Sequence, residues 1–225
     1  MTKLDYEFRL LDFHYKNEKP EENSDSSNSD EKPTKYIDHA QFKIQVFGIN
    51  EKGETCSILL NNYLPFFFIK VENDWTDNRV KLFSEHIKNT IGKYYYKSVV
   101  SVKLVRKKKL YGFDGGKLHS FVQISFTNTT ALNKVKYLFY REDHSALRRD
   151  GYVYQGVSLF LYEANIPPLL RYFHIQEISP SGWIKIPKNR YIMSSILYYS
   201  NYCENSKNLL QKISKWPNIQ KELHF

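Results

Sequence analysis

The sequence predicts an α+β fold with a mixed, mainly antiparallel sheet and flanking helices. Apolar and polar residues alternate over 42–49, and the turn-forming residues 50–53 that follow indicate a β-hairpin with 55–63 as its return strand. In contrast, 75–91 and 128–139 carry apolar residues at helical spacing. Hairpins mixed with helices do not favour a doubly wound parallel sheet.

The composition is that of a globular protein. Of 225 residues, 41% are hydrophobic and 16% aromatic, which is enough apolar surface for a core. No apolar run approaches the roughly 20 residues of a membrane-spanning helix, and the N-terminal MTKLDYEF is unlike a signal peptide. We therefore expect a soluble intracellular chain. Cys56 and Cys203 fit no zinc or disulfide motif.

The N-terminal part divides into a strand and an acidic tract. Residues 1–16 are predicted to hold a strand with Tyr6 and Phe8 on one face. Residues 17–36 are predicted to be a disordered acidic insertion, because 17–33 contains no apolar residue. This stretch has six acidic and two basic residues, so the rest of the chain is more positive than the formal net charge of +9. Such a charge favours a polyanionic partner.

Residues 37–158 are expected to form one α+β domain. Its first helix is predicted to begin after Thr76 or Asp77 as N-cap, and its second after Asn128 or Thr129. Further strands are predicted at 66–71, 99–105 and 121–126, with a glycine-rich turn at 112–116.

Residues 159–187 are expected to be a core-forming joint segment. Pro167 and Pro168 fix two φ angles and remove two amide donors, which ends the apolar strand before them and lets a helix begin at Pro168 or Leu169. A turn at 179–182 then leads into a short strand. The segments on either side are predicted to be a polar loop at 141–155 and a tail at 188–225.

The strongest chemical signal is a basic run followed by aromatic residues. Its cations would neutralise phosphates, and Tyr111 would offer a face to an unpaired base. The alternative is a solvated strand end that keeps a hairpin soluble, and for Tyr111 and Phe113 the pattern favours burial in the core. The candidate nucleic-acid-binding residues are Lys103, Arg106, Lys107, Lys108, Lys109 and Tyr111.

Three separated motifs resemble the N-terminal region of family B DNA polymerases, especially the delta-like enzymes of large DNA viruses. They appear in the family's order and span 42–187. The motifs are Phe47-Gly48 with Pro65 to Phe68, then Leu110 to Phe113, and finally Tyr162 to Ile166 with Arg171 to Phe173, Gly182-Trp183 and Ile186-Pro187.

This resemblance implies the fold of that N-terminal domain and a template-binding or scaffold role in DNA replication. The family's exonuclease site needs an Asp-x-Glu strand motif to hold two metal ions, and the one such motif here, at 5–7, lies at the wrong end. We therefore expect no catalytic or metal-binding residue and no cofactor in this chain, with Mg²⁺ belonging to the exonuclease and polymerase domains. The isolated chain should be inactive.

The resemblance also implies partners, a location and a structural set of residues. The partners would be single-stranded or template DNA and the remaining exonuclease and polymerase part, at a cytoplasmic replication site or in the nucleus of an infected cell. Arg171 and Trp183 stand in apolar surroundings, where a guanidinium must be paired and an indole fills a large volume. The residues expected to be structural are Tyr162, Asn165, Arg171, Phe173 and Trp183.

Two alternatives remain beside the polymerase interpretation. The chain would be a free-standing module for single-stranded nucleic acid, using the same basic surface, or an adaptor that docks another protein through an apolar face.

Overall fold

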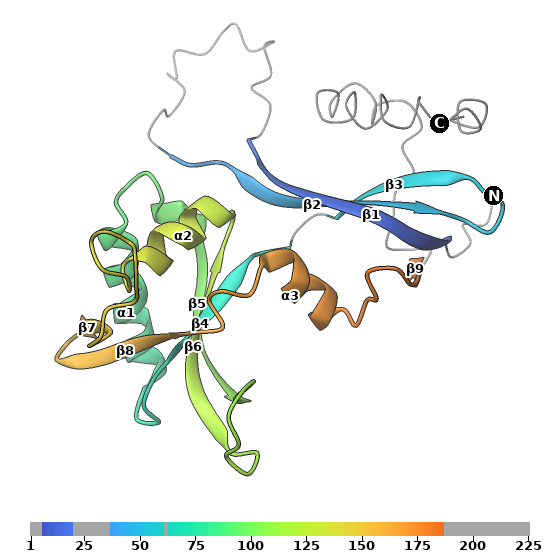
Figure 1. Cartoon of the computed structure of the whole chain (residues 1–225). Helices are drawn as coiled ribbons and strands as arrows, with labels where there is room; N and C mark the ends of the chain where they lie inside the picture. The colour runs from blue at the N-terminus through green and yellow to red at the C-terminus, as the bar shows by residue number, and fades with distance from the viewer. Residues whose placement is uncertain (1–5, 20–36, 61–62, 187–225) are drawn as a thin grey trace, which may run out of the picture. The chain divides into compact units, whose positions relative to one another are not determined.

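The computed structural model describes residues 6–19, 37–60 and 63–186 (Figure 1). The chain forms two compact units. The described residues of unit 1 fall within 6–14, 44–60 and 173–186, and those of unit 2 within 15–19, 37–43 and 63–172. The acidic insertion predicted at 17–36 lies outside the described residues from 20 onward, and Asn17 and Glu18 end a strand instead. The tail predicted at 188–225 lies wholly outside them.

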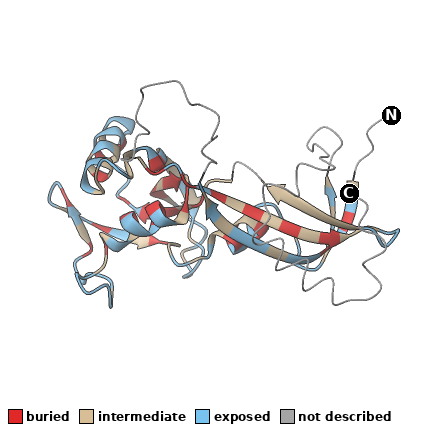
Figure 2. Ribbon diagram, turned by 90° about the horizontal axis from the view of Figure 1, so that it is seen from above, coloured by how far each residue is buried: buried red, intermediate tan, exposed pale blue. Residues whose placement is uncertain are grey.

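A four-stranded sheet has the order β3-β2-β1-β9, and its two middle strands run through both units. Its pairings β2 with β3 and β1 with β9 are antiparallel. Buried residues alternate with more exposed ones along β1 and β2 (Figure 2), which is the period-two pattern that the sequence predicted. The strands are β1 (Tyr6–Glu18), β2 (Gln41–Ile49), β3 (Thr55–Leu60) and β9 (Trp183–Ile186).

Gly48 is required by the close approach of two strands in unit 1. A Cβ at this position would lie 2.2 Å from the Phe8 ring and 2.7 Å from the carbonyl oxygen of Arg9. Any side chain would therefore push β2 away from β1, which gives a packing reason for the glycine of the Phe47-Gly48 motif.

Unit 2 is built on a five-stranded antiparallel sheet of order β5-β6-β4-β8-β7. The chain order β4-α1-β5-β6-α2-β8 is that of a split βαβ arrangement. Strand β6 lies between β4 and β5 in the sheet, so the two strands joined by α1 are not neighbours. The elements are β4 (Phe66–Lys70), α1 (Asp77–Thr90), β5 (Val99–Lys108), β6 (Leu118–Phe126), α2 (Thr129–Tyr137), β7 (Tyr152–Tyr154) and β8 (Val157–Tyr162).

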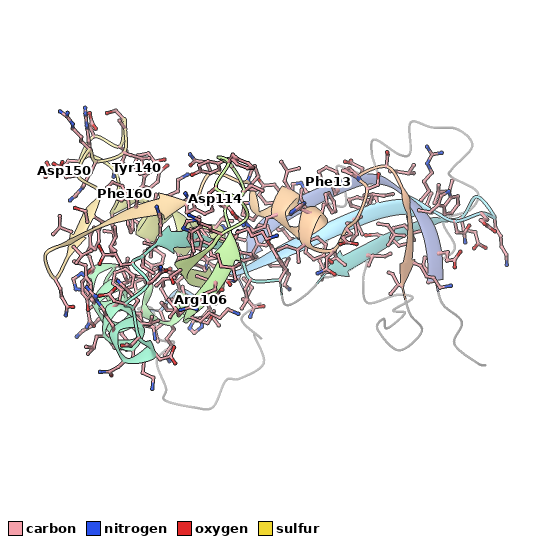
Figure 3. The ribbon with its side chains drawn as sticks, turned by 90° about the horizontal axis from the view of Figure 1, so that it is seen from below. Phe13, Arg106, Asp114, Tyr140, Asp150 and Phe160 are labelled. Atoms are coloured by element: carbon pink, nitrogen blue, oxygen red, sulfur yellow. The ribbon has the colours of Figure 1, made fainter. Side chains whose placement is uncertain are left out.

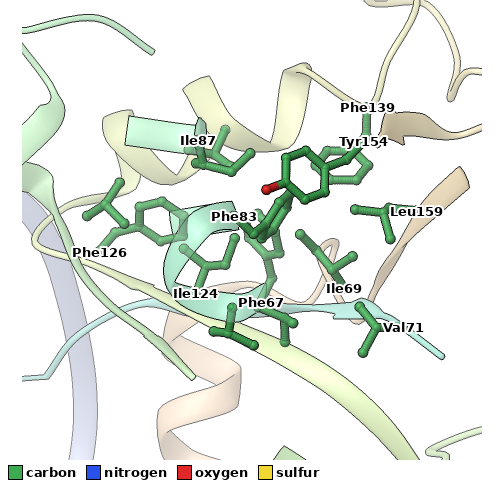
Figure 4. Close-up of a cluster of buried hydrophobic side chains, with 14 of the residues drawn as sticks. Phe67, Ile69, Val71, Phe83, Ile87, Ile124, Phe126, Phe139, Tyr154 and Leu159 are labelled. Carbon is green, nitrogen blue, oxygen red and sulfur yellow. The ribbon is translucent and has the colours of Figure 1, made fainter. Parts of the chain in front are cut away.

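The main core of unit 2 lies between its two helices and one face of this sheet. Phe83 and Ile87 of α1 pack with Phe67 and Ile69 of β4 and with Ile124 of β6 (Figure 4). The other face carries a smaller cluster of Phe68, Phe121 and Tyr162. The predicted α+β fold with a mainly antiparallel sheet and flanking helices is confirmed.

Local chemistry explains where the helices begin. The Thr76 hydroxyl accepts from the Arg79 amide at 3.3 Å, and the Asn128 side chain accepts from the Ala131 amide at 2.9 Å, so both predicted N-caps are present. A third helix, α3 (Pro168–Ile175), begins at the predicted proline. A short 3₁₀ helix, η1 (Tyr96–Ser98), precedes β5.

Strand β7 was not predicted, because it lies in the segment 141–155 that was expected to be a loop. β7 pairs antiparallel with β8, from Tyr152 opposite Leu159 to Tyr154 opposite Val157. The two residues between them, Gln155 and Gly156, both have positive φ, as a tight two-residue hairpin turn requires. The overlooked signal was therefore this Gln-Gly pair between two short apolar runs.

Candidate nucleic-acid interface

The basic run forms the outer end of a long hairpin in unit 2. β5 and β6 pair antiparallel as far as Lys108 opposite Leu118, beyond the last pairing of β6 with β4 at Phe121 (Figure 1). Three glycines with positive φ shape the turn, namely Gly112, Gly115 and Gly116. The predicted strands 99–105 and 121–126 are thus shorter than the real ones, and the hairpin projects past the body of the sheet.

Strand alternation divides the cations between the two faces of the hairpin. Val105 packs against the cluster of Phe68, Phe121 and Tyr162, so Lys103 and Lys107 lie on that face. Leu104 packs against the main core, so Arg106 and Lys108 lie on the opposite face. The exposed cations of β5 are Lys103, Arg106 and Lys108, and Figure 3 labels Arg106.

Lys107 is engaged within the protein. Its Nζ forms an ion pair with Glu163 and lies 4.2 Å from the centroid of the Phe68 ring and 5.6 Å from that of Tyr162. Only 29% of its side chain is exposed. Lys107, one of the candidate nucleic-acid-binding residues, is thus already paired with a carboxylate that follows a distant strand.

Lys109 and His119 hold the one carboxylate of the turn. Asp114 Oδ2 lies 2.5 Å from His119 Nε2 and 3.8 Å from Lys109 Nζ. The hydrogen bond from His119 holds the pKa of the Asp114 carboxyl below its usual value, and the charge of Lys109 acts in the same direction. The Asp114 carboxylate thus stays ionised, and the nearby Lys109 ammonium offsets its charge.

Glu163 is shared by two cations. Its side chain is buried and accepts from Arg171 Nη1 at 2.8 Å as well as from Lys107, while Arg171 Nη2 donates to the backbone oxygen of Glu163 at 2.5 Å. The guanidinium lies 4.7 Å from the centroid of the Phe66 ring. Arg171 is 5% exposed, so the expectation of a buried, paired guanidinium agrees with the structure. This cluster joins β5, the end of β8 and α3.

Three rings form an aromatic column beside this cluster. The Phe121 and Tyr162 centroids are 4.7 Å apart, and Tyr162 and Tyr111 are 5.0 Å apart with a 28° angle between their planes. Tyr162 is buried, and its hydroxyl accepts from the Leu110 amide. Burial and the neighbouring Tyr162 and Glu163 raise the pKa of the Tyr111 hydroxyl. Tyr111 nevertheless keeps 63% of its surface exposed.

Two core assignments made from the sequence are wrong. Tyr111 and Phe113 were expected inside the core, but Phe113 is 102% exposed and Tyr111 covers Tyr162 from outside. Trp183 on β9 is 57% exposed, so it does not fill a large core volume among the described residues. In each case the alternation of a strand or the projection of a turn carries the ring outward.

The other residues expected to be structural have mixed surroundings. Phe173 is buried and meets the Phe13 ring edge-on in unit 1 at 5.1 Å. Asn165 is exposed, and its Oδ1 accepts from the Tyr140 hydroxyl at 3.5 Å.

A groove of unit 2 lies between α2 and the loop 164–168. It is an open groove of about 240 Å³, lined by Asn133, Lys136, Asn165 and Pro167 among others. Burial lowers the pKa of Lys136, the one cation among the described lining residues. With one lysine among its described lining residues, this groove attracts a polyanion less than the hairpin with the three exposed cations of β5 does.

The described residues show neither a metal site nor a membrane-spanning helix. Within the described ranges, no group of three His, Cys, Asp or Glu side chains is placed to hold a metal ion. Over the same residues, no helix is long and apolar enough to span a membrane.

Comparison with known proteins identifies the family. Residues 62–133 match the model for the N-terminal domain of DNA polymerase delta catalytic subunit-like proteins. The chain is 50% identical over 162 residues to the DNA polymerase of Phaeocystis pouchetii virus, covering 69% of this chain and 16% of that protein. It is 32% identical over 182 residues to the DNA polymerase of Pyramimonas orientalis virus, covering 80% and 13%.

A cellular relative and a solved structure are more distant. The DNA polymerase delta catalytic subunit of Schizosaccharomyces pombe is 23% identical over 148 residues, covering 66% of this chain and 13% of that subunit. The family B DNA polymerase of the archaeon Pyrobaculum calidifontis aligns with a TM-score of 0.49 and 18% identity, over 79% of this chain and 17% of that one. The chain thus spans less than a fifth of the length of these proteins. By its sequence, the chain belongs to the delta-like family B DNA polymerases, and it matches their N-terminal region.

Proposed function

We propose that this chain is the template-binding and scaffold part of a family B DNA-directed DNA polymerase, and that single-stranded DNA binds along the β5–β6 hairpin. The observation that carries the proposal is the meeting of exposed cations and an exposed, anchored aromatic ring on one hairpin. The residues are Lys103, Arg106, Lys108 and Tyr111.

The electrostatic part of this binding rests on fewer cations than the sequence indicates. Lys107 and Lys109 already lie beside Glu163 and Asp114, whereas Lys103, Arg106 and Lys108 are exposed. Arg106 and Lys108 share one face of the hairpin, so two phosphate contacts on that face give a log-log salt slope of roughly −1.4, at about 0.7 per phosphate. Binding should therefore weaken well below molar salt.

The stacking part rests on Tyr111. Tyr162 covers one of its faces, and the outer surface remains available to a base. Because Tyr162 and the Leu110 amide hold this part of the turn, little ordering of the side chain is needed on binding. Tyr111→Ala should lose about 1 to 3 kcal/mol of binding free energy with an unchanged salt slope.

We infer the remaining roles from membership of the family. The exonuclease and polymerase carboxylates, with their Mg²⁺ ions, belong to the part of the enzyme that this chain would contact as a scaffold. Purified chain should neither extend a primer nor degrade DNA, with or without magnesium. Primer-extension gels with a trace-labelled primer measure both activities, and incorporation that persists through repeated purification would contradict this expectation.

A free-standing module for single-stranded nucleic acid is the second candidate. It is favoured by one observation, namely that every cation and ring of the interface belongs to unit 2 alone. A fusion or mixture with the downstream polymerase part separates the candidates, since only a polymerase scaffold should raise primer extension by that part.

The DNA-binding proposal is tested by charge reversal with a matched control. Arg106→Glu combined with Lys108→Glu removes two exposed cations of the hairpin, while Lys81→Glu combined with Lys93→Glu makes the same charge change away from its tip. Fluorescence anisotropy with a labelled single strand, titrated at several salt concentrations, should show loss of affinity and a shallower slope for the hairpin variant only. Equal binding by both variants would contradict DNA binding by the hairpin and would favour the alternative that the basic run only keeps the hairpin soluble.

A further inference from the structure

The tip of the hairpin concentrates exposed apolar side chains. Leu110, Tyr111, Phe113 and Leu118 are all exposed within one turn and its flanks. Among them Phe113 has no covered surface, since its side chain is 102% exposed. Exposed apolar clusters of this kind mark sites of contact with a partner.

The residues on both sides of Phe113 are held in place. Before it, the Leu110 amide donates to the Tyr162 hydroxyl and Tyr111 stacks on Tyr162. After it, Asp114 is hydrogen-bonded to His119. The turn therefore presents the Phe113 ring from an anchored backbone, which lowers the entropic cost of burying it against a partner.

The charges on the hairpin indicate a negatively charged partner. Arg106, Lys108 and Lys117 are exposed on the strands and turn that carry the ring, and the one carboxylate of the turn, Asp114, is hydrogen-bonded to His119 and lies 3.8 Å from Lys109. The tip thus combines an apolar ring with positive charge. Nucleic acid has the complementary arrangement, with flat apolar base faces between phosphates.

The two aromatic residues of the turn differ in how they can stack. Tyr111 has one face against Tyr162, so it can only end a stack of bases. Phe113 has both faces uncovered, so a base can lie on each side of it. We propose that Phe113 inserts between two neighbouring bases of a DNA strand whose phosphates lie against Arg106, Lys108 and Lys117.

This inference rests on the proposed function and adds a preference for the form of DNA. Inserting a ring requires two bases to separate, which costs least where the strand is already unpaired. The chain should consequently favour single strands over duplexes of the same sequence. Phe113 would also bend or unstack the bound strand at one step.

The test uses the 225-residue chain and an oligonucleotide that carries the fluorescent base 2-aminopurine next to an adenine. Separation of the stacked bases by Phe113 should raise the emission of 2-aminopurine on binding. Phe113→Ala should weaken binding by about five-fold or more and abolish the rise, with the salt slope unchanged. Phe113→Trp keeps a flat ring and should retain wild-type affinity.

Leu118→Ala is the matched control, because Leu118 is an exposed apolar residue of the same tip. It should bind DNA as the wild type does, and both alanine variants should keep the wild-type melting temperature. An equal loss of affinity for Leu118→Ala and Phe113→Ala would indicate general apolar docking, as in contact with protein, and would overturn insertion. Wild-type affinity and emission for Phe113→Ala would also overturn it while leaving the proposed DNA binding intact. A wild-type chain that does not bind the strand at low salt would instead refute the proposed function itself.

Discussion

The side chain of Asn128 donates to the Asp38 carboxylate at 2.8 Å while its oxygen caps helix α2. Asn128 is fully buried, and its Nδ2 also lies 2.8 Å from the carbonyl oxygen of Ala40. The cap bond goes to the Ala131 amide at 2.9 Å. One amide group thus ties the segment before β2 to the start of a helix 90 residues away in the sequence.

Replacing Asn128 by alanine should destabilise the chain by about 2 to 4 kcal/mol. The lost cap accounts for roughly 1 kcal/mol, and the buried Asp38 carboxylate loses a donor at a further cost of about 1 to 3 kcal/mol. Asn128→Ser keeps a cap oxygen but cannot donate both hydrogen bonds. The stability of the serine variant should therefore lie between those of the wild type and the alanine variant. Urea denaturation measures all three, and an equal stability of the serine and alanine variants would mean that the cap contributes nothing.

Glu163→Gln should destabilise the chain by about 3 kcal/mol. This change leaves the buried Arg171 guanidinium and the half-buried Lys107 ammonium without their shared counter-charge. Lys107→Met should cost less, since Arg171 still pairs with Glu163. A double-mutant cycle of these changes gives the coupling energy, and a glutamine variant within about 0.5 kcal/mol of wild type would be inconsistent with a buried ion cluster.

The Asp114 carboxyl should make the hairpin turn sensitive to acid. Its pKa is lowered in the folded state by the His119 hydrogen bond. A group with a lowered pKa stabilises the fold above its unfolded pKa of about 4, and this contribution is lost as the pH falls through the lower folded value. The measurement is the NMR shift of the Asp114 carboxyl carbon against pH, and a midpoint at or above 4 would contradict the contact.

Removing the same carboxylate at neutral pH should strengthen DNA binding. Asp114→Asn makes Lys109 available for a phosphate, so the affinity for single-stranded DNA should rise and the salt slope should steepen by about 0.7. Asp143→Asn makes the same charge change in another loop of unit 2 and serves as the control. Anisotropy titrations that show equal slopes for the two variants would exclude a role for Lys109.

Two aromatic residues of unit 1 should differ sharply in their contribution to stability. Phe173→Ala removes a buried ring and should cost about 3 to 5 kcal/mol. Trp183→Ala changes a side chain with 57% of its surface exposed and should cost less than about 1 kcal/mol. Thermal unfolding followed by circular dichroism compares them, and a larger loss for Trp183 would contradict the exposure of its indole.

Features set by neighbouring residues could be predicted from the sequence. Thr76, Asn128 and Pro168 mark helix starts because caps and proline act within one turn of the chain. The β2–β3 hairpin followed from its turn, where the Asn50 side chain accepts from the Lys52 and Glu54 amides.

The candidate site depended on contacts that the sequence does not reveal. Lys107 stands 56 residues from Glu163, and no local pattern indicates that this lysine rather than Lys108 is paired. Likewise, the exposure of Tyr111 is decided by Tyr162, which the sheet brings beneath it. Identifying the basic run was therefore possible from residues alone, whereas sorting its paired cations from its exposed ones required the tertiary structure.

Strand β5 is an edge strand, so its exposed cations should also affect pairing with other chains. Its outer edge has no neighbouring strand in the described sheet, so the amide and carbonyl groups of alternate residues point away from β6. Repulsion between Lys103, Arg106 and Lys108 of two copies should keep such edges from pairing. Exchanging them for isoleucine should cause edge-to-edge self-association visible by light scattering, whereas exchanging them for glutamate should leave the chain monomeric.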